Sequence, residues 1–249
     1  MLRYRVCSLV DSRSPSVRNF SLMKILLFGA TGSAGGGVLE ACLAASIVDE
    51  VRAITRRPLM NTSSKLRTFV HKDFLNYATV EEAFRGLDAC LFCLGVSATQ
   101  VSKEEYRKIT YSYTLAAAQM FKSKSHGAAF HYISGQGTRA DSRMFWSRVK
   151  AQTEHDLIEL VDADCWRPAF IDAPPSPSLP KVYRIFFPLL RVLRPFPSLY
   201  VSGTDLGRAM LQATRENLRK RIIENKEIWQ IAARADFCGA ALNPIPKIL

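Results

Sequence analysis

The chain has 249 residues, of which 48% are apolar and 22% charged, and its formal net charge is +12. This length can bury a full core as one α/β domain, and its six cysteines lack the spacing of a small disulfide scaffold. The positive charge suits anionic ligands such as nucleotides. Basic residues are scattered, however, and alternate with acids in residues 215–227, so no nucleic-acid partner is expected.

The first 22 residues form a basic extension with four arginines, several serines and one acid. This composition is that of a mitochondrial transit peptide, and it lacks the apolar segment of a secretory signal. The alternative is an extension from an upstream start codon, with Met23 as the working start. We expect a cytoplasmic protein, with mitochondrial import through this extension as the alternative.

Residues 24–58 are the stretch around which the chain is organised. An apolar run, residues 25–28, predicts a buried parallel strand, and a glycine-rich turn follows it at once. A segment with helical periodicity comes next, and residues 51–55 predict a second strand. Strand, glycine turn, helix and strand in this order are typical of a dinucleotide-binding unit.

The glycines of this turn have separate physical roles. Gly29 lets the chain leave the strand in a tight turn, Gly32 has no Cβ and lets a pyrophosphate approach the backbone, and Gly35 allows close helix packing. The alternative is a unit that keeps its glycines for packing and binds nothing. The residues expected to bind the phosphates are Gly29, Thr31, Gly32, Ser33, Ala34 and Gly35.

Strands and helices alternate through the rest of the first two thirds of the chain. This alternation predicts an α/β doubly wound parallel sheet, a Rossmann fold, with a small C-terminal substrate lobe. Further strands are expected at residues 66–71, 88–95, 129–134 and 165–171. Helices are expected at residues 79–85 and 102–122, each opened by a capping box, and at residues 147–161, 204–215 and 220–232.

The pattern changes after residue 172. A loop rich in proline and serine leads to residues 182–196, which are apolar with three arginines and are broken at Pro188. This segment is too short and too charged to span a bilayer. We expect residues 174–203 to be a lid-like insertion in a single domain, residues 23–249. The alternative is an interfacial amphipathic helix that makes a peripheral membrane contact.

Cys90 and Cys93 have the spacing of a metal or redox pair but lie in an apolar strand. Residues three apart in a strand point to opposite faces, so two such thiolates cannot hold one metal. We therefore expect small core residues of a reduced protein, and no metal site.

Taken together, the motifs resemble those of the atypical or extended short-chain dehydrogenases. The nearer likeness is to the group that contains NmrA-like proteins, Tat-interacting-protein oxidoreductases and NAD-dependent epimerase-like proteins. It covers roughly residues 24–232. The segments that carry it are GATGSAGGGVL (29–39), TRRP (55–58), DF (73–74), CLGVS (93–97), YISGQGT (132–138), WSRVKAQTEHDL (146–157), RPAFI (167–171) and SGTDLGRAML (202–211).

The end of the second strand distinguishes the two nicotinamide dinucleotides. An acid there binds the ribose 2′-OH, whereas arginine accommodates a 2′-phosphate. This chain has Arg56 and Arg57 and no acid, which favours NADP over NAD. The alternative is a pair of exposed arginines without a ligand. The resemblance also implies that Asp73 and Phe74 lie at the adenine, and that Leu94 and Gly95 lie beneath the nicotinamide ribose.

The resemblance implies a catalytic Ser, Tyr and Lys, with the Tyr and Lys four residues apart. Lys150 stands at the Lys position, but Trp146 occupies the Tyr position, and an indole has no proton to exchange near neutral pH. Ser134 is the candidate serine, although many relatives use the next position, here Gly135. Tyr132 and Tyr106 are candidates for a replacement phenol, and the alternative for both is packing in the core. His131 and His155 are expected to be structural or exposed and not catalytic.

Two functions from different classes follow. The first is an NADP-dependent oxidoreductase or epimerase-like enzyme, which acts on a small organic substrate with Ser134 and Lys150. The second is a non-catalytic NAD(P)-sensing or scaffold protein of the NmrA-like type. The missing Tyr favours the second, and Lys150 favours the first only weakly because this Lys also binds the ribose.

Overall fold

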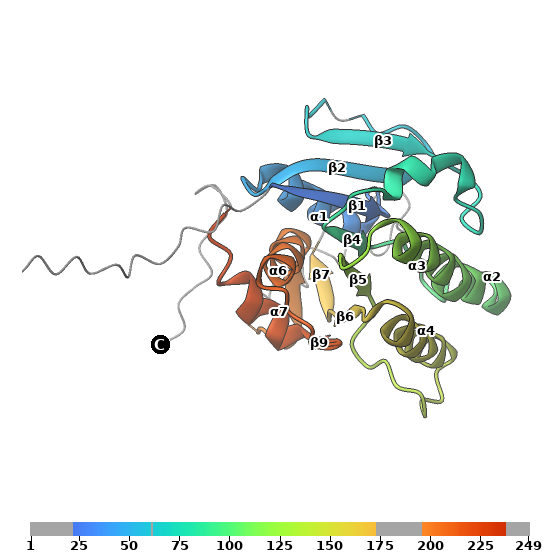
Figure 1. Cartoon of the computed structure of the whole chain (residues 1–249). Helices are drawn as coiled ribbons and strands as arrows, with labels where there is room; N and C mark the ends of the chain where they lie inside the picture. Colours follow the sequence, from blue (N-terminus) through green and yellow to red (C-terminus); the bar gives the residue numbers. More distant parts are fainter. Residues whose placement is uncertain (1–21, 61, 173–195, 238–249) are drawn as a thin grey trace, which may run out of the picture.

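The computed structural model describes residues 22–60, 62–172 and 196–237, and the body of this part is a parallel sheet covered by helices on both faces (Figure 1). Its strands are β1 (Met23–Phe28), β2 (Val48–Thr55), β3 (Leu66–Val70), β4 (Ala89–Phe92), β5 (Ala129–Ile133), β6 (Asp164–Arg167) and β9 (Ile222–Glu224). They lie in the order β3-β2-β1-β4-β5-β6-β9, and each neighbouring pair is parallel. The predicted doubly wound α/β class is confirmed.

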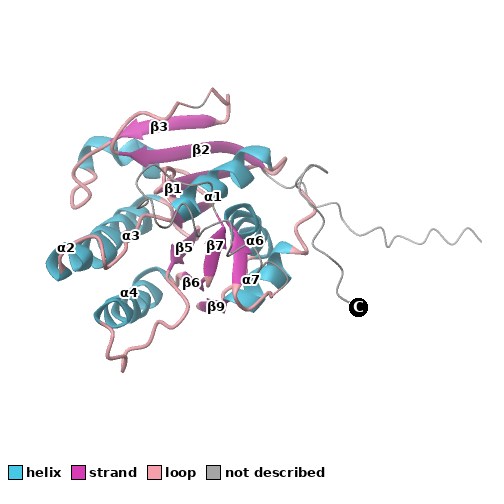
Figure 2. Cartoon of the chain, turned by 180° about the vertical axis from the view of Figure 1, so that it is seen from behind, coloured by secondary structure: helices cyan, strands magenta, loops and turns pink. Residues whose placement is uncertain are grey.

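Two helical layers bury the two faces of this sheet. One layer consists of α1 (Ser33–Ala44), α6 (Gly203–Glu216) and α7 (Asn225–Ala232), and the other of η1 (Ala78–Phe84), α2 (Lys103–Arg107), η2 (Lys108–Ser112), α3 (Tyr113–Lys124) and α4 (Phe145–Val161). In both views α6 lies beside α7, and α3 lies beside α4 (Figures 1 and 2). Successive residues of β1 alternate between the layers, as its continuous apolar sequence predicts.

The layer that contains α1 depends on glycines where two helices touch. A Cβ at Gly37 would lie 2.5 Å from the backbone of Gly203 in α6, and a Cβ at Gly207 would lie 2.7 Å from the Cβ of Ala41. Any larger side chain would push α6 away from α1. The predicted helix at residues 204–215 therefore packs against the helix of the dinucleotide-binding unit.

Two predicted C-terminal elements are each divided in the structure. The strand expected at residues 165–171 ends at Arg167, because Pro168 has no N–H to continue the ladder. The chain resumes as β7 (Phe170–Asp172), which pairs with β8 (Tyr200–Ser202) in a separate two-stranded sheet. The helix expected at residues 220–232 begins only at α7, because Ile222–Glu224 pairs with β6 as the last strand of the main sheet.

Two predicted helices also differ in detail. The Ser102 cap is confirmed, since its Oγ accepts from Glu105 N, but the helix that follows contains a π-helical turn, η2. The segment expected to begin with a capping box at Thr79 is a 3₁₀ helix from Ala78, and Thr79 Oγ1 bonds to His71 Nδ1 instead. The strand expected at residues 88–95 is shorter, Ala89–Phe92, although Cys93 N still donates to Phe28 O.

Three expectations lie outside the described residues. They are the basic extension, the proline-rich loop and most of the lid-like insertion expected at residues 174–203, of which the structure describes only residues 196–203, where β8 pairs with β7.

Candidate functional site

The glycine turn lies where the sheet reverses its strand order, between β1 and β4. Gly29 follows β1 with φ +77°, and a Cβ there would lie 2.6 Å from the carbonyl carbon and oxygen of Cys93. A Cβ at Gly35 would lie 2.0 Å from Gly29 O, so neither position accepts a side chain. In parallel α/β sheets, ligands bind at the carboxyl ends of the strands at this reversal.

The first turn of α1 has open backbone donors. Gly32 is the N-cap residue, no side chain caps the helix, and its first turn contains no acid. A Cβ at Gly32 would have Gly29 O, 3.3 Å away, as its only neighbour within 4 Å among the described residues, so these residues leave space for a ligand beside Gly32. A helix start of this kind favours an anion through its free N–H groups and its dipole. Thr31, Ser33 and Ala34 lie in the same turn, as predicted.

Arg56 and Arg57 directly follow β2 and are both exposed. Neither guanidinium has a carboxylate partner among the residues that the structure describes. Thr55, which is 7% exposed, donates its Oγ1–H to Arg57 O at 2.7 Å, and its own carbonyl accepts from His71 N. Thr55 thus holds the turn that carries both arginines, a role that the sequence alone did not reveal.

Asp73 and Phe74 follow β3 but face different surroundings. Asp73 is exposed, and its Oδ1 accepts from Leu75 N at 3.1 Å. The Phe74 side chain is 4% exposed and packs against the rings of Phe28 and Tyr113. Only the backbone at position 74 is therefore placed for contact with a ligand at this edge.

The end of β4 leads to Leu94, which is half-buried, and to Gly95, which is exposed. Cys90 and Cys93 lie in opposite core layers, as the strand geometry predicted, and burial raises the pKa of both thiols. Both are free thiols. No cluster of His, Cys, Asp and Glu suited to a metal occurs in the described part of the chain.

Ser134 and Lys150 lie together at the carboxyl end of β5. Lys150 Nζ donates to Ser134 O at 2.6 Å and to Ile133 O at 3.2 Å, and it lies 5.6 Å from the centre of the Tyr132 ring. The Ser134 hydroxyl bonds to Thr138 Oγ1 at 3.1 Å. The hydrogen bond between Lys150 and Ser134 is therefore made to the backbone carbonyl of Ser134. Burial lowers the pKa of Lys150 from 10.5 to about 8.

Neither Tyr132 nor Tyr106 is placed to replace the phenol that Trp146 displaces. Tyr132 is 1% exposed and Tyr106 is 2% exposed, and burial raises the pKa of both. Trp146 itself is half-buried, and its ring lies beside Gly137, where a Cβ would come within 3.8 Å of it. The tyrosines belong to the core, so the alternative of packing holds for both.

His131 is a structural residue, and His155 is exposed. His131 is fully buried, its Nδ1 accepts from Trp166 Nε1 at 3.1 Å, and its Nε2 bonds to Thr214 Oγ1 at 2.9 Å. Burial lowers the pKa of His131 to about 3. His155 is exposed on α4.

A buried ion pair supports the Lys150 region and was missed in the sequence. Arg167 donates Nε and Nη2 to the two carboxylate oxygens of Glu154 at 2.9 and 2.6 Å, and Glu154 is 3% exposed. These bonds raise the pKa of Arg167. The pair connects α4 to the end of β6, so it helps to position Lys150, which is also on α4, relative to the sheet.

No family model matches the chain. Its sequence is nevertheless similar to Protein HTATIP2 of Rattus norvegicus, at 24% identity over 228 residues, which cover 85% of this chain and 90% of that protein. In sequence the chain is similar to this protein, and in fold to the short-chain dehydrogenases.

Other relatives of this dehydrogenase-like chain match a shorter stretch. Protein FMP52, mitochondrial, of Candida albicans is 25% identical over 142 residues, which cover 55% of this chain and 62% of that protein. The chain spans 52–62% of the length of the first curated relatives that it matches.

Solved structures share the fold. An oxidoreductase of the short chain dehydrogenase/reductase family from Burkholderia thailandensis aligns with TM-score 0.62 at 16% identity, covering 81% of this chain and 89% of that one. The Bordetella bronchiseptica enzyme WbmH, solved with NAD+, aligns with TM-score 0.60 at 16% identity, covering 78% and 72%. Across the described residues, this dehydrogenase-like fold contains no helix of the length and apolarity that a membrane crossing requires.

Proposed function

We propose that the chain binds NADP at the carboxyl edge of its sheet and acts as an oxidoreductase or epimerase-like enzyme on a small organic substrate. One observation carries the cofactor half. The start of α1, which no side chain caps, lies at the strand-order reversal. Arg56 and Arg57 lie at the end of the neighbouring strand, and no described residue is their carboxylate partner. The likeness to an enzyme solved with NAD+ supports a nicotinamide dinucleotide, and the two arginines support the 2′-phosphate form.

The residues present fit such a cofactor. The Gly29–Gly35 turn and the amides of α1 would hold the diphosphate, Arg56 and Arg57 the 2′-phosphate, and Asp73 the adenine side. When bound, NADP supplies hydride transfer. Lys150 fixes the Ser134 carbonyl, and through it the end of β5, beside which the reacting end of a substrate would lie.

The experiment is a titration of the purified chain with NADPH and NADH, followed by nicotinamide fluorescence, and then an oxidation assay against a panel of carbonyl compounds. Arg56→Ala with Arg57→Ala should weaken NADPH by about 10- to 100-fold and leave NADH within about twofold. Lys122→Ala, an exposed lysine on α3, is the matched control. Equal weakening of both cofactors would refute the 2′-phosphate assignment.

The second candidate is an NAD(P)-sensing or scaffold protein without turnover. It is favoured by Trp146 at the Tyr position, by the burial of Tyr132 and Tyr106, and by the use of Lys150 as a donor to backbone carbonyls. Tight NADPH binding with no oxidation of any carbonyl compound would decide for this candidate.

The cellular location is a separate proposal. The likeness to a protein named as mitochondrial supports import through the basic residues 1–22 over the cytoplasm. A fluorescent protein fused behind residues 1–22 should collect in mitochondria, and the same fusion with its four arginines changed to glutamine should not. A diffuse signal from the unchanged fusion would support the cytoplasmic alternative.

A further inference from the structure

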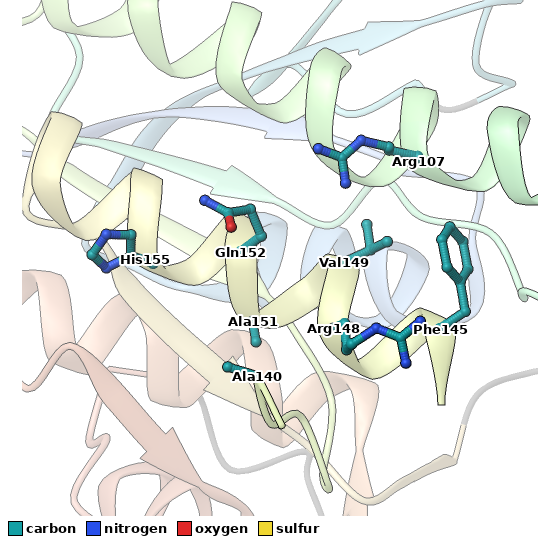
Figure 3. Close-up of a pocket in the computed structure, with 8 residues that line it drawn as sticks. All are labelled: Arg107, Ala140, Phe145, Arg148, Val149, Ala151, Gln152 and His155. Atoms are coloured by element: carbon teal, nitrogen blue, oxygen red, sulfur yellow. The ribbon is translucent and has the colours of Figure 1, made fainter. Parts of the chain in front are cut away.

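A depression of about 520 Å³ lies between α4 and Arg107 at the end of α2, and neither Ser134 nor Lys150 lines it. We call it the α4 pocket. Figure 3 shows its lining side chains along α4, with Arg107 reaching toward them from the neighbouring helix. Its lining consists of Arg107, Ala140, Phe145, Arg148, Val149, Ala151, Gln152 and His155.

We propose that the α4 pocket binds an organic anion: a carboxylate or phosphate attached to an apolar body about the size of a ring system. The lining pairs two guanidinium groups and an imidazole with the Phe145 ring, Val149 and two alanines, and it contains no acid. A volume of this size is typical of small-molecule sites, in which an apolar wall holds the body and a few polar groups orient it.

The two arginines are held in place without being neutralised. Arg148 donates Nη1 to the carbonyls of Ser142 and Arg143 at 2.8 and 2.9 Å, which are uncharged acceptors. Arg107 lies over the ring of Tyr111 at 5.0 Å, and the Tyr111 hydroxyl donates to Asp156 at 2.6 Å. Asp156 thus fixes the ring that supports Arg107, while neither arginine has a carboxylate partner within the described ranges.

The start of α4 adds to this positive potential. The helix begins at Phe145, at one end of the pocket (Figure 3), its N-cap Met144 offers no side-chain bond, and its first turn contains no acid. The amide dipoles of a 17-residue helix favour an anion at this end. The same charges disfavour a second copy of the chain here, because a two-fold contact would bring arginines against arginines.

The probe is 1-naphthyl phosphate, titrated by calorimetry into the full chain with and without NADPH. We expect binding in the micromolar to millimolar range that is the same in both conditions, about tenfold weaker in Arg107→Gln and in Arg148→Gln, and unchanged in the exposed control Lys226→Gln. 1-Naphthol and inorganic phosphate, which each carry half of the ligand, should bind at least tenfold more weakly.

Three outcomes would overturn the proposal. They are the absence of binding at millimolar probe, binding by both arginine variants as tight as by the wild type, and inorganic phosphate binding as tightly as the naphthyl ester. A concentration-dependent dimer in sedimentation that Phe145→Glu dissociates would assign the pocket to a second copy and would overturn it as well. None of these outcomes depends on whether the chain binds NADP.

Discussion

Replacement of Lys150 by methionine tests whether this lysine is held in a buried, weakly basic state. Its side chain is half-buried, and its ammonium group lies beside the Tyr132 ring and donates to two backbone carbonyls. Burial lowers its pKa from 10.5 to about 8. Methionine keeps most of the apolar stem and removes the titrating group.

The effect of pH on stability follows from the difference between the ordinary pKa of lysine and the pKa of Lys150 in the folded chain. Between pH 8 and pH 10.5 the unfolded chain holds the proton on Lys150 and the folded chain does not. Since the unfolded state then binds more protons, the free energy of unfolding rises with pH in this window. At about 1.36 kcal/mol for each tenfold change, the full contribution is about 3 kcal/mol, present above pH 10.5 and lost as the pH falls through 8.

The assay is urea unfolding followed by tryptophan fluorescence at pH 7.5, 8.5 and 9.5. The free energy of unfolding of the wild type minus that of Lys150→Met should rise by about 1.5 to 2 kcal/mol across this range. Lys122→Met, on the exposed face of α3, should leave the pH profile as it is in the wild type. A flat or falling difference would show that Lys150 stays charged when folded, with the Glu154 carboxylate outweighing its burial.

Three further changes test other parts of the site. Gly35→Ala should abolish NADPH binding or prevent folding, because its Cβ would lie 2.0 Å from a carbonyl oxygen. Gly36→Ala, whose Cβ would lie 3.7 Å from its nearest neighbour, should bind NADPH and unfold like the wild type. Circular dichroism and the NADPH titration compare the two variants. Glu154→Gln should lower the free energy of unfolding by about 1.5 to 3 kcal/mol, because Arg167 would lose its buried carboxylate partner and keep only the more exposed Glu224. Urea unfolding measures this, and a loss below about 1 kcal/mol would contradict it. Trp146→Tyr should restore carbonyl-dependent NADPH oxidation if only the phenol is missing, and an inactive variant that still binds NADPH would favour the sensing function.

The dinucleotide-binding unit was predictable because its signals are local. Gly29 and Gly35 constrain the backbone within seven residues, and the strands on either side are continuous apolar runs. The last strand of the sheet was not predictable in this way. Ile222–Glu224 is only three residues long, too short to show a period of two, and the flanking residues favour a helix. What makes it a strand is a distant partner, Cys165 to Arg167 in β6.

The site shows the same division between local and distant causes. Arg56 and Arg57 could be placed because they end a strand, and the structure puts them at the expected edge. The contact between Thr55 Oγ1 and the Arg57 carbonyl depends on the turn geometry, which sequence spacing does not give. The Glu154–Arg167 pair joins a helix to a strand 13 residues away, and many exposed acids and bases have similar spacing.

The loss of the tyrosine phenol at position 146 limits which groups of this fold can act as a proton donor. Spacing placed Trp146 at the Tyr position, and the structure then removes the two obvious replacements, since Tyr132 and Tyr106 lie in the core with raised pKa values. A general acid must reach the substrate oxygen by a direct hydrogen bond or through one water. In the described residues around Lys150, the Ser134 hydroxyl and the lysine itself remain. If the chain turns over a substrate, its rate should therefore follow the pKa of Lys150 near 8, and a rate that is constant from pH 7 to 9 would place the proton donor outside this pair.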